Sequence, residues 1–106
     1  MFISKGKHYK ILMEAARIVK TKGTVGGKAR IDGTRVRVID IVQDYEVSGN
    51  AIPEIADNYN LSSVQVLEAL KYYYQHPEEI REEIRSEKNL LEKFKKEGKV
   101  IVFQHS

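Results

Sequence analysis

The sequence predicts a mainly α-helical protein in which a small β-hairpin precedes a three-helix unit of the helix-turn-helix kind. An added C-terminal helix and a short terminal strand follow that unit. Three observations predict this class. Residues 26–38 alternate apolar and basic side chains around an Asp-Gly pair, as hairpins do. From residue 40 onward the apolar side chains repeat at helical spacing, and helix start signals at Pro53 and Ser62 divide that stretch into three.

The predicted hairpin over residues 26–38 organises the rest of the chain. Asp32-Gly33 predicts a tight turn, because glycine tolerates the positive φ that such a turn requires. Period-two geometry places Ile31, Val36 and Val38 on one face, against the helices. The opposite face is cationic, and its four members are Lys28, Arg30, Arg35 and Arg37. We expect the three arginines to stay exposed while the apolar face packs on the helices. The hairpin either presents these cations to a ligand or only closes one side of the helical core.

Residues 1–25 form an N-terminal extension. A helix is predicted from about Lys5 to Ala16, because the apolar side chains in that range fall on one stripe. Ile18-Val19 either extends this helix or begins a strand, since β-branching favours a strand without deciding between them.

Residues 26–76 hold the hairpin and the three helices. Asp40 is expected to cap the first helix, and Pro53 lies in the first turn of the second, where its missing N–H costs nothing. Asn60 suits a left-handed cap, and Ser62 with Gln65 forms a capping box for the third helix. The predicted core stripe of the third helix is Val66, Leu67, Leu70 and Tyr74, with Val64, Ala69 and Tyr73 beside it.

Residues 77–106 form the C-terminal part. After His76-Pro77, a helix is expected over residues 78–97, followed by a strand over residues 99–103. Its neighbouring acids, Glu78, Glu79, Glu82 and Glu83, read as a solvated face. Its apolar stripe consists of Ile80, Ile84, Leu91 and Phe94. Because the three-helix core is expected to be complete without it, this stripe predicts a binding surface for this chain, for a second copy or for another protein.

Charge is distributed unevenly along the chain, although the net charge is only +3. Residues 1–38 carry ten cations against two acids, whereas residues 39–76 carry one cation against six acids. The basic N-terminal segment indicates contact with a polyanion. The alternative is that these charges only keep a small protein soluble. There is no cysteine and no apolar run of membrane-spanning length, so a soluble cytoplasmic protein is expected.

The residues that catalysis or metal binding needs are not grouped in this sequence. The three histidines are scattered, and Gly26-Gly27-Lys28 lacks the earlier glycine and the following Ser or Thr of a phosphate loop. No nucleophile, base and orienting group come together. We therefore expect no enzyme activity, no metal site and no cofactor.

DNA is the polyanion that a helix-turn-helix unit suggests. The third helix would offer Ser62, Ser63 and Gln65 to base edges, and Gln can bond adenine. Its only cation is Lys71, so phosphate contacts would have to come from the hairpin. The alternative is a three-helix core that binds no DNA.

The hairpin motif, Gly26-Gly27-Lys28 followed by Ile31-Asp32-Gly33-Thr34-Arg35, resembles that of a widespread prokaryotic family of domains of unknown function. The resemblance covers residues 18–84 and includes Tyr72-Tyr73-Tyr74 and Pro77-Glu78-Glu79-Ile80. It implies a homeodomain-like three-helix unit behind a β-hairpin. Many members look like VapB-type antitoxins, whose partner is a PIN-domain ribonuclease. Ala29 departs from the pattern, because many members have proline there.

These observations lead to two expectations. The first is an antitoxin that forms a homodimer, binds its own promoter DNA and masks a PIN-domain toxin with its C-terminal segment. The second is a dimeric protein-interaction adaptor with the same fold and no DNA binding. The basic hairpin and the capped third helix favour the first, and the acidic middle favours the second.

Overall fold

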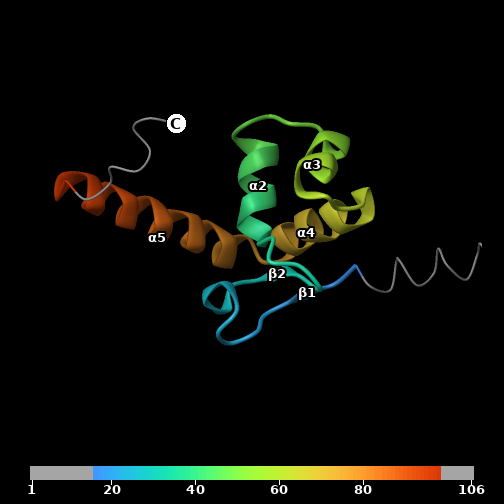
Figure 1. The fold of residues 1–106 in the computed structure, drawn as a ribbon, viewed down its shortest axis with the longest axis horizontal. Helices are drawn as coiled ribbons and strands as arrows, with labels where there is room; N and C mark the ends of the chain where they lie inside the picture. Colours follow the sequence, from blue (N-terminus) through green and yellow to red (C-terminus); the bar gives the residue numbers. More distant parts are fainter. Residues whose placement is uncertain (1–15, 99–106) are drawn as a thin grey trace, which may run out of the picture.

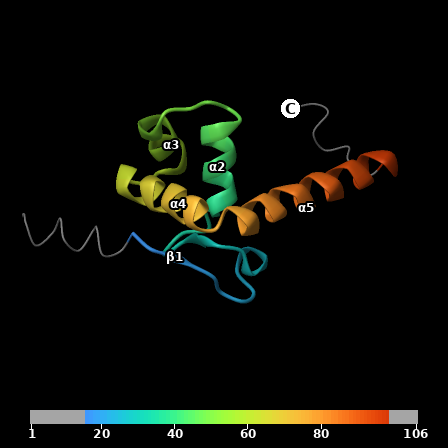
Figure 2. The same cartoon turned by 180° about the vertical axis from the view of Figure 1, so that it is seen from behind.

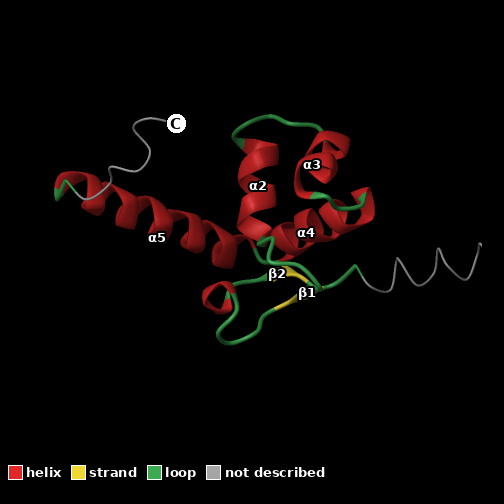
Figure 3. Ribbon diagram, viewed as in Figure 1, coloured by secondary structure: helices red, strands yellow, loops and turns green. Residues whose placement is uncertain are grey.

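The computed structural model describes residues 16–98 (Figure 1). In chain order the elements are β1 (Ile18–Val19), the short 3-10 turn η1 (Val25–Gly27), β2 (Arg30–Ile31), α2 (Val38–Glu46), α3 (Ile52–Tyr59), α4 (Ser63–Gln75) and α5 (Pro77–Lys96). The described part is therefore mainly helical, with four α-helices and one small antiparallel pair of strands (Figure 3). Apart from Ala16, the predicted N-terminal helix and the predicted strand over 99–103 lie outside the described residues.

The observed strand pair is not the predicted hairpin, because the strand partner of β2 is the preceding strand β1 and not the segment that follows the Asp32-Gly33 turn. β1 pairs with β2, with Ile18 opposite Ile31, so Ile18-Val19 is a strand. The predicted second arm is reduced to one bridge between Arg30 and Arg37, because Val38 already begins α2. Ile31 N–H donates to the carbonyl of Val36 (2.9 Å) across a loop over residues 32–35.

The Thr34 side chain closes this loop. Its hydroxyl donates to the Ile31 carbonyl (2.8 Å) and accepts from Val36 N–H (3.0 Å). Thr34 thereby takes the hydrogen bonds that a longer strand ladder would have used. Gly33 has φ +81°, as the turn prediction requires.

The residues expected at the helix ends predicted the bounds of α3 and the start of α4 correctly, and the start of α2 incorrectly. Pro53 lies in the first turn of α3, and Asn60 closes α3 with φ 57°. Asp40 is not the cap of α2, which begins at Val38 after Arg37. Asp40 instead lies inside the first turn, where its carboxylate accepts from Arg37 N–H (3.0 Å). An acidic side chain three residues past the cap reaches back to the cap N–H in this way.

One core joins the strands and all four helices. Ile31 and Val38 are fully buried and Val36 packs against them, as the alternation predicted. In α4 the buried stripe is Val66, Ala69, Leu70 and Tyr73. The predicted stripe was wrong in two positions, since Leu67 is 50% and Tyr74 63% exposed. α4 is apolar around most of its surface, so spacing alone did not determine which residues face the core.

The first turns of α5 belong to this core. Ile80 is fully buried and Ile84 packs on the cluster, so the expectation that the core is complete without α5 was wrong. Beyond them α5 runs away from the three-helix unit (Figure 2). Every residue from Lys88 to Gly98 is exposed. None of the described helices is long and apolar enough to cross a membrane.

Candidate nucleic-acid and partner interfaces

Two predicted hairpin cations converge on one carboxylate of α5. Lys28 Nζ lies 2.6 Å from Glu87 Oε2, and Arg37 Nη1 contacts the same oxygen. Asp40 holds the other edge of the Arg37 guanidinium, with Nη2 donating to Oδ1 (2.8 Å) and Nε to Oδ2 (3.2 Å). All four side chains are between one quarter and one third exposed. Lys28 and Arg37 are therefore already neutralised within the chain.

A second ion pair joins the start of α5 to the residue that follows β1. Lys20 Nζ lies 2.7 Å from Glu79 Oε2, and the Tyr72 hydroxyl donates to Glu79 Oε1 (2.9 Å). Glu83 stands between Glu79 and Glu87 on the same side of the helix, and its buried Oε1 accepts no hydrogen bond from the described residues. Of the acids interpreted as a solvated face, only Glu78 and Glu82 are well exposed, whereas Glu79 and Glu83 are half-buried.

The three half-buried carboxylates differ in acidity. Burial alone would raise the pKa of Glu87, but hydrogen bonds from Lys28 and Arg37 outweigh it and lower the pKa. The pKa of Glu79 is lowered in the same way, since hydrogen bonds from Lys20 and Tyr72 outweigh its burial. Burial and the neighbouring Glu79 charge raise the pKa of Glu83. This face of α5 is therefore held to the segment before α2 by its two ends, Glu79 and Glu87.

The other two predicted cations behave differently from this pair. Arg30 donates from Nη1 to the Thr34 carbonyl and from Nη2 to Thr21 Oγ1, both at 2.9 Å, and is half-buried. Arg35 is exposed and forms no ion pair or hydrogen bond with the described residues. The prediction that Arg30, Arg35 and Arg37 all stay exposed is confirmed for Arg35 and wrong for the other two.

The predicted base-reading residues lie at the start of α4, after a turn over residues 60–62. The capping box is reciprocal, because Gln65 N–H donates to Ser62 Oγ (3.1 Å) and Ser62 N–H donates to Gln65 Oε1 (2.8 Å). Ser62 and Ser63 are exposed. Within residues 16–98, no hydrogen bond or ion pair links this group to the hairpin cations.

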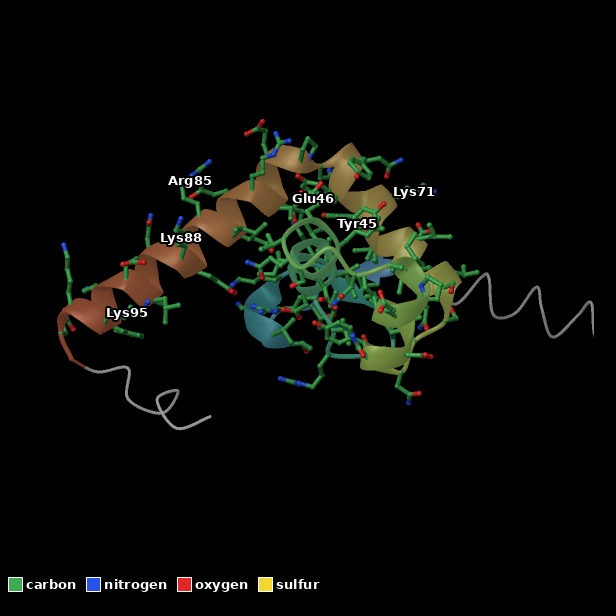
Figure 4. The ribbon with its side chains drawn as sticks, turned by 90° about the horizontal axis from the view of Figure 1, so that it is seen from above. Tyr45, Glu46, Lys71, Arg85, Lys88 and Lys95 are labelled. Atoms are coloured by element: carbon green, nitrogen blue, oxygen red, sulfur yellow. The ribbon has the colours of Figure 1, made fainter. Side chains whose placement is uncertain are left out.

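The outer half of α5 presents an apolar surface. Leu90 is 51%, Leu91 42% and Phe94 37% exposed. Leu90 was absent from the predicted stripe, although it lies four residues before Phe94 and so shares a face with it. Lys88 and Lys95, labelled in Figure 4, project from this same part of the helix. Of the predicted partner residues, Leu91 and Phe94 are available to a partner, whereas Ile80 belongs to the core.

A shallow hollow of about 350 Å³ lies between α2 and α3. It is lined by Asp40, Gln43, Asp44, Val47, Ser48 and Tyr59. Its two carboxylates are already engaged, because Asp40 holds Arg37 and Asp44 accepts from Asn50 (2.7 Å). No group of three or more acids or histidines within residues 16–98 is arranged to hold a metal ion. The hollow offers no reactive group.

Comparison with known proteins places the fold in a family. The family described as "Protein of unknown function (DUF433)" matches residues 18–73. A crystal structure of a DUF433 member protein from Anabaena variabilis ATCC 29413 is similar, with 34% sequence identity and a TM-score of 0.61. The similarity covers 78% of this chain and 81% of that one. No match was found among curated proteins. The match takes in β1, β2, α2, α3 and all but the last two residues of α4.

Proposed function

The chain belongs to the DUF433 family of proteins of unknown function, and we propose that it is an antitoxin of a type II toxin–antitoxin pair. In this proposal α3 and α4 bind DNA as a homeodomain-like helix-turn-helix, and the outer half of α5 binds and blocks a PIN-domain ribonuclease. The protein acts as a homodimer on its own promoter. DNA binding and toxin binding are thus assigned to different parts of the chain, the first to α3 and α4 and the second to the outer half of α5.

The exposed outer half of α5 is the observation that supports partner capture. Leu90, Leu91 and Phe94 form an apolar surface on a helix whose first turns are fixed in the core. An amphipathic helix of this kind binds a partner by laying its apolar face into a groove. Its cations Lys88, Lys93, Lys95 and Lys96 complement an acidic catalytic cleft of the sort that holds metal ions in nucleases.

The support for DNA binding is the geometry of α3 and α4. The two helices are joined by a three-residue turn at 60–62, and the capping box leaves Ser62 and Ser63 facing solvent. The first residues of the second helix are those that such units insert into the major groove. Arg35 is the hairpin cation that is free to add a phosphate contact.

Inhibition of a ribonuclease tests the proposal. We expect the chain to suppress RNA cleavage by a PIN-domain ribonuclease encoded beside it. Leu90→Ala should weaken suppression at least tenfold, because a central apolar anchor typically costs more than ~1.4 kcal/mol. Leu67→Ala is the matched control, since Leu67 on α4 is equally exposed. Full cleavage in the presence of excess wild-type chain would exclude the antitoxin function.

A specific observation favours the second candidate, a protein-interaction adaptor that binds no DNA. Glu87 neutralises Lys28 and Arg37, and the start of α4 is uncharged. Phosphate contacts supply most DNA affinity, so a surface on which Arg35 alone among the four hairpin cations is exposed favours the adaptor. Fluorescence anisotropy with the chain's own upstream DNA distinguishes the two. Binding that falls steeply with salt supports the antitoxin, and no binding at low salt supports the adaptor.

A further inference from the structure

We propose that Lys28 and Arg37 form a binding site for a backbone phosphate of duplex DNA, and that Glu87 of α5 occupies this site in the free chain. The inference rests on the proposed DNA-binding function and adds a regulator to it. Glu87 is then an internal competitor for DNA, and a partner that draws α5 away from the hairpin exposes the site.

The geometry of the contact supports an anion site. Two cations from different positions of the N-terminal segment meet at a single oxygen, Glu87 Oε2. Convergent charged donors on one oxygen are how proteins hold phosphates as well as carboxylates. A phosphate oxygen in the place of Oε2 would meet Lys28 Nζ and Arg37 Nη1 from the same directions.

Asp40 makes this site rigid. It accepts from Arg37 Nε and Nη2 and from the Arg37 backbone N–H. These bonds hold the guanidinium so that Nη1 points toward Glu87 whether or not α5 stays in place. Asp40 and Glu83 are the other acids beside the cations, and both remain there after Glu87 leaves. They favour a single phosphate contact over a broad polyanion surface.

Glu87 is the last partly buried residue of α5 before its exposed outer half. Residues 88–98 are all exposed, and the apolar surface begins at Leu90, three residues after Glu87. A partner seated on Leu90, Leu91 and Phe94 therefore acts directly beside the contact. The contact itself is partly open to water, with 29% of the Lys28 and 33% of the Glu87 side chain exposed. Water and salt therefore reach this pair and screen it in part.

The test replaces the competitor and measures DNA binding. Glu87→Gln should bind a 20-base-pair duplex of arbitrary sequence about tenfold more tightly than wild type at low salt. The slope of log affinity against log salt should steepen by about 1 to 2, because two cations become available to phosphate. Glu92→Gln is the matched control: it removes the same charge from an exposed position of the same helix. Fluorescence anisotropy supplies both quantities.

A double variant shows whether the gain comes from this site. Lys28→Met in the Glu87→Gln background should remove at least half of the added salt slope. Thermal unfolding of each variant checks that the fold is kept. Equal binding by Glu87→Gln and Glu92→Gln would overturn the proposal, as would the absence of duplex binding by every variant at low salt.

These outcomes can be separated from those of the proposed function. Tighter duplex binding by Glu87→Gln, without inhibition of the ribonuclease by the chain, would support the phosphate site and exclude the antitoxin function. Inhibition of the ribonuclease without tighter duplex binding by Glu87→Gln would support the antitoxin function and exclude the phosphate site.

Discussion

Arg37 connects three parts of the molecule. Its backbone forms an isolated β-bridge with Arg30 of β2, and it is the residue that precedes α2. Its guanidinium contacts both Asp40 on α2 and Glu87 on α5. A charged side chain with partners on two helices and a backbone position at a helix start contributes to stability in several ways at once. Arg35, two residues earlier, has none of these contacts with the described residues.

This contrast gives a prediction. Arg37→Ala should lower the free energy of unfolding by about 1–3 kcal/mol, because Asp40 and Glu87 lose charged hydrogen-bond partners. Arg35→Ala should change it by less than about 0.5 kcal/mol. Urea unfolding of both variants beside wild type measures the difference. Equal effects would mean that the ion pairs of Arg37 contribute nothing to stability.

Glu79 and Glu87 make stability depend on pH. Their pKa values in the folded protein lie below the ordinary glutamate value, so their contribution is complete above about pH 4.3 and is lost as the pH falls through the lowered pKa. Glu83 acts in the opposite sense, since its raised pKa favours the folded state upon protonation.

A charge-removing variant isolates one of these groups. Glu79→Gln should be less stable than wild type at about pH 7, and the gap should close as the pH falls through the lowered pKa of Glu79, because protonated Glu79 is neutral like glutamine. Glu78→Gln is the control, because Glu78 is 89% exposed and its pair with Arg81 is long, at 3.8 Å. Urea midpoints across the pH range test this. A gap between wild type and Glu79→Gln that is independent of pH would contradict the assigned role.

At the scale of the element, α5 consists of two different halves. The first half contributes Ile80 to the core, and its Glu79 and Glu87 form ion pairs with Lys20 and Lys28, whereas the second half is exposed throughout. A single helix therefore acts both as part of the core and as a surface for a partner. Removing side chains from each half should separate these roles.

Substitutions along α5 are expected to differ in kind. Ile80→Ala should cost about 2–5 kcal/mol of folding free energy, because it leaves a cavity in a fully buried position. Leu90→Ala should leave stability nearly unchanged, since Leu90 is half exposed. Thermal and urea unfolding compare them. A large loss of stability with Leu90→Ala would show that the outer half packs against another part of the protein.

Most helix signals that act over a few residues were reliable, although Asp40 was wrongly expected to cap α2. Pro53, Asn60 and the Ser62–Gln65 box were predicted correctly, because each depends only on neighbouring backbone groups. The exposure of Arg37 was predicted wrongly, because Glu87 lies fifty residues away in sequence. The strand partner of Ile31 and the buried face of α4 likewise depend on tertiary packing. Alternation and periodicity do not encode such long-range choices.

At the scale of the whole molecule, the exposed surface of α5 predicts self-association. Residues 78–87 carry five acids and two arginines, whereas residues 88–96 carry four lysines and one acid. Two α5 helices crossing in opposite directions would place the acidic half of each near the basic half of the other, and would cover Leu90, Leu91 and Phe94. Such a pair also supplies two α4 helices for a palindromic site. A toxin would then compete with the second copy for this surface.

Sedimentation velocity at micromolar concentration checks this. We expect a dimer for the full chain and a monomer for Phe94→Asp, because a buried carboxylate without a partner is costly at an apolar interface. Tyr74→Asp is the control, since Tyr74 is an exposed aromatic on α4. Removing the chain after His76 would be a poorer test, because it also deletes Ile80 from the core. A full-length monomer would rule out the dimer.

The anchored half of α5 has a consequence for how its outer half is ordered. Starting a helix is costly in conformational entropy, whereas extending one adds a hydrogen bond for each residue fixed. The turns around Ile80 are held by the core, so they serve as a permanent nucleus from which the outer turns propagate. A protein that captures residues 88–96 therefore needs to supply only the cost of propagation. The amides of those residues should exchange with solvent deuterium faster than the amides around Ile80, and should slow when a partner binds.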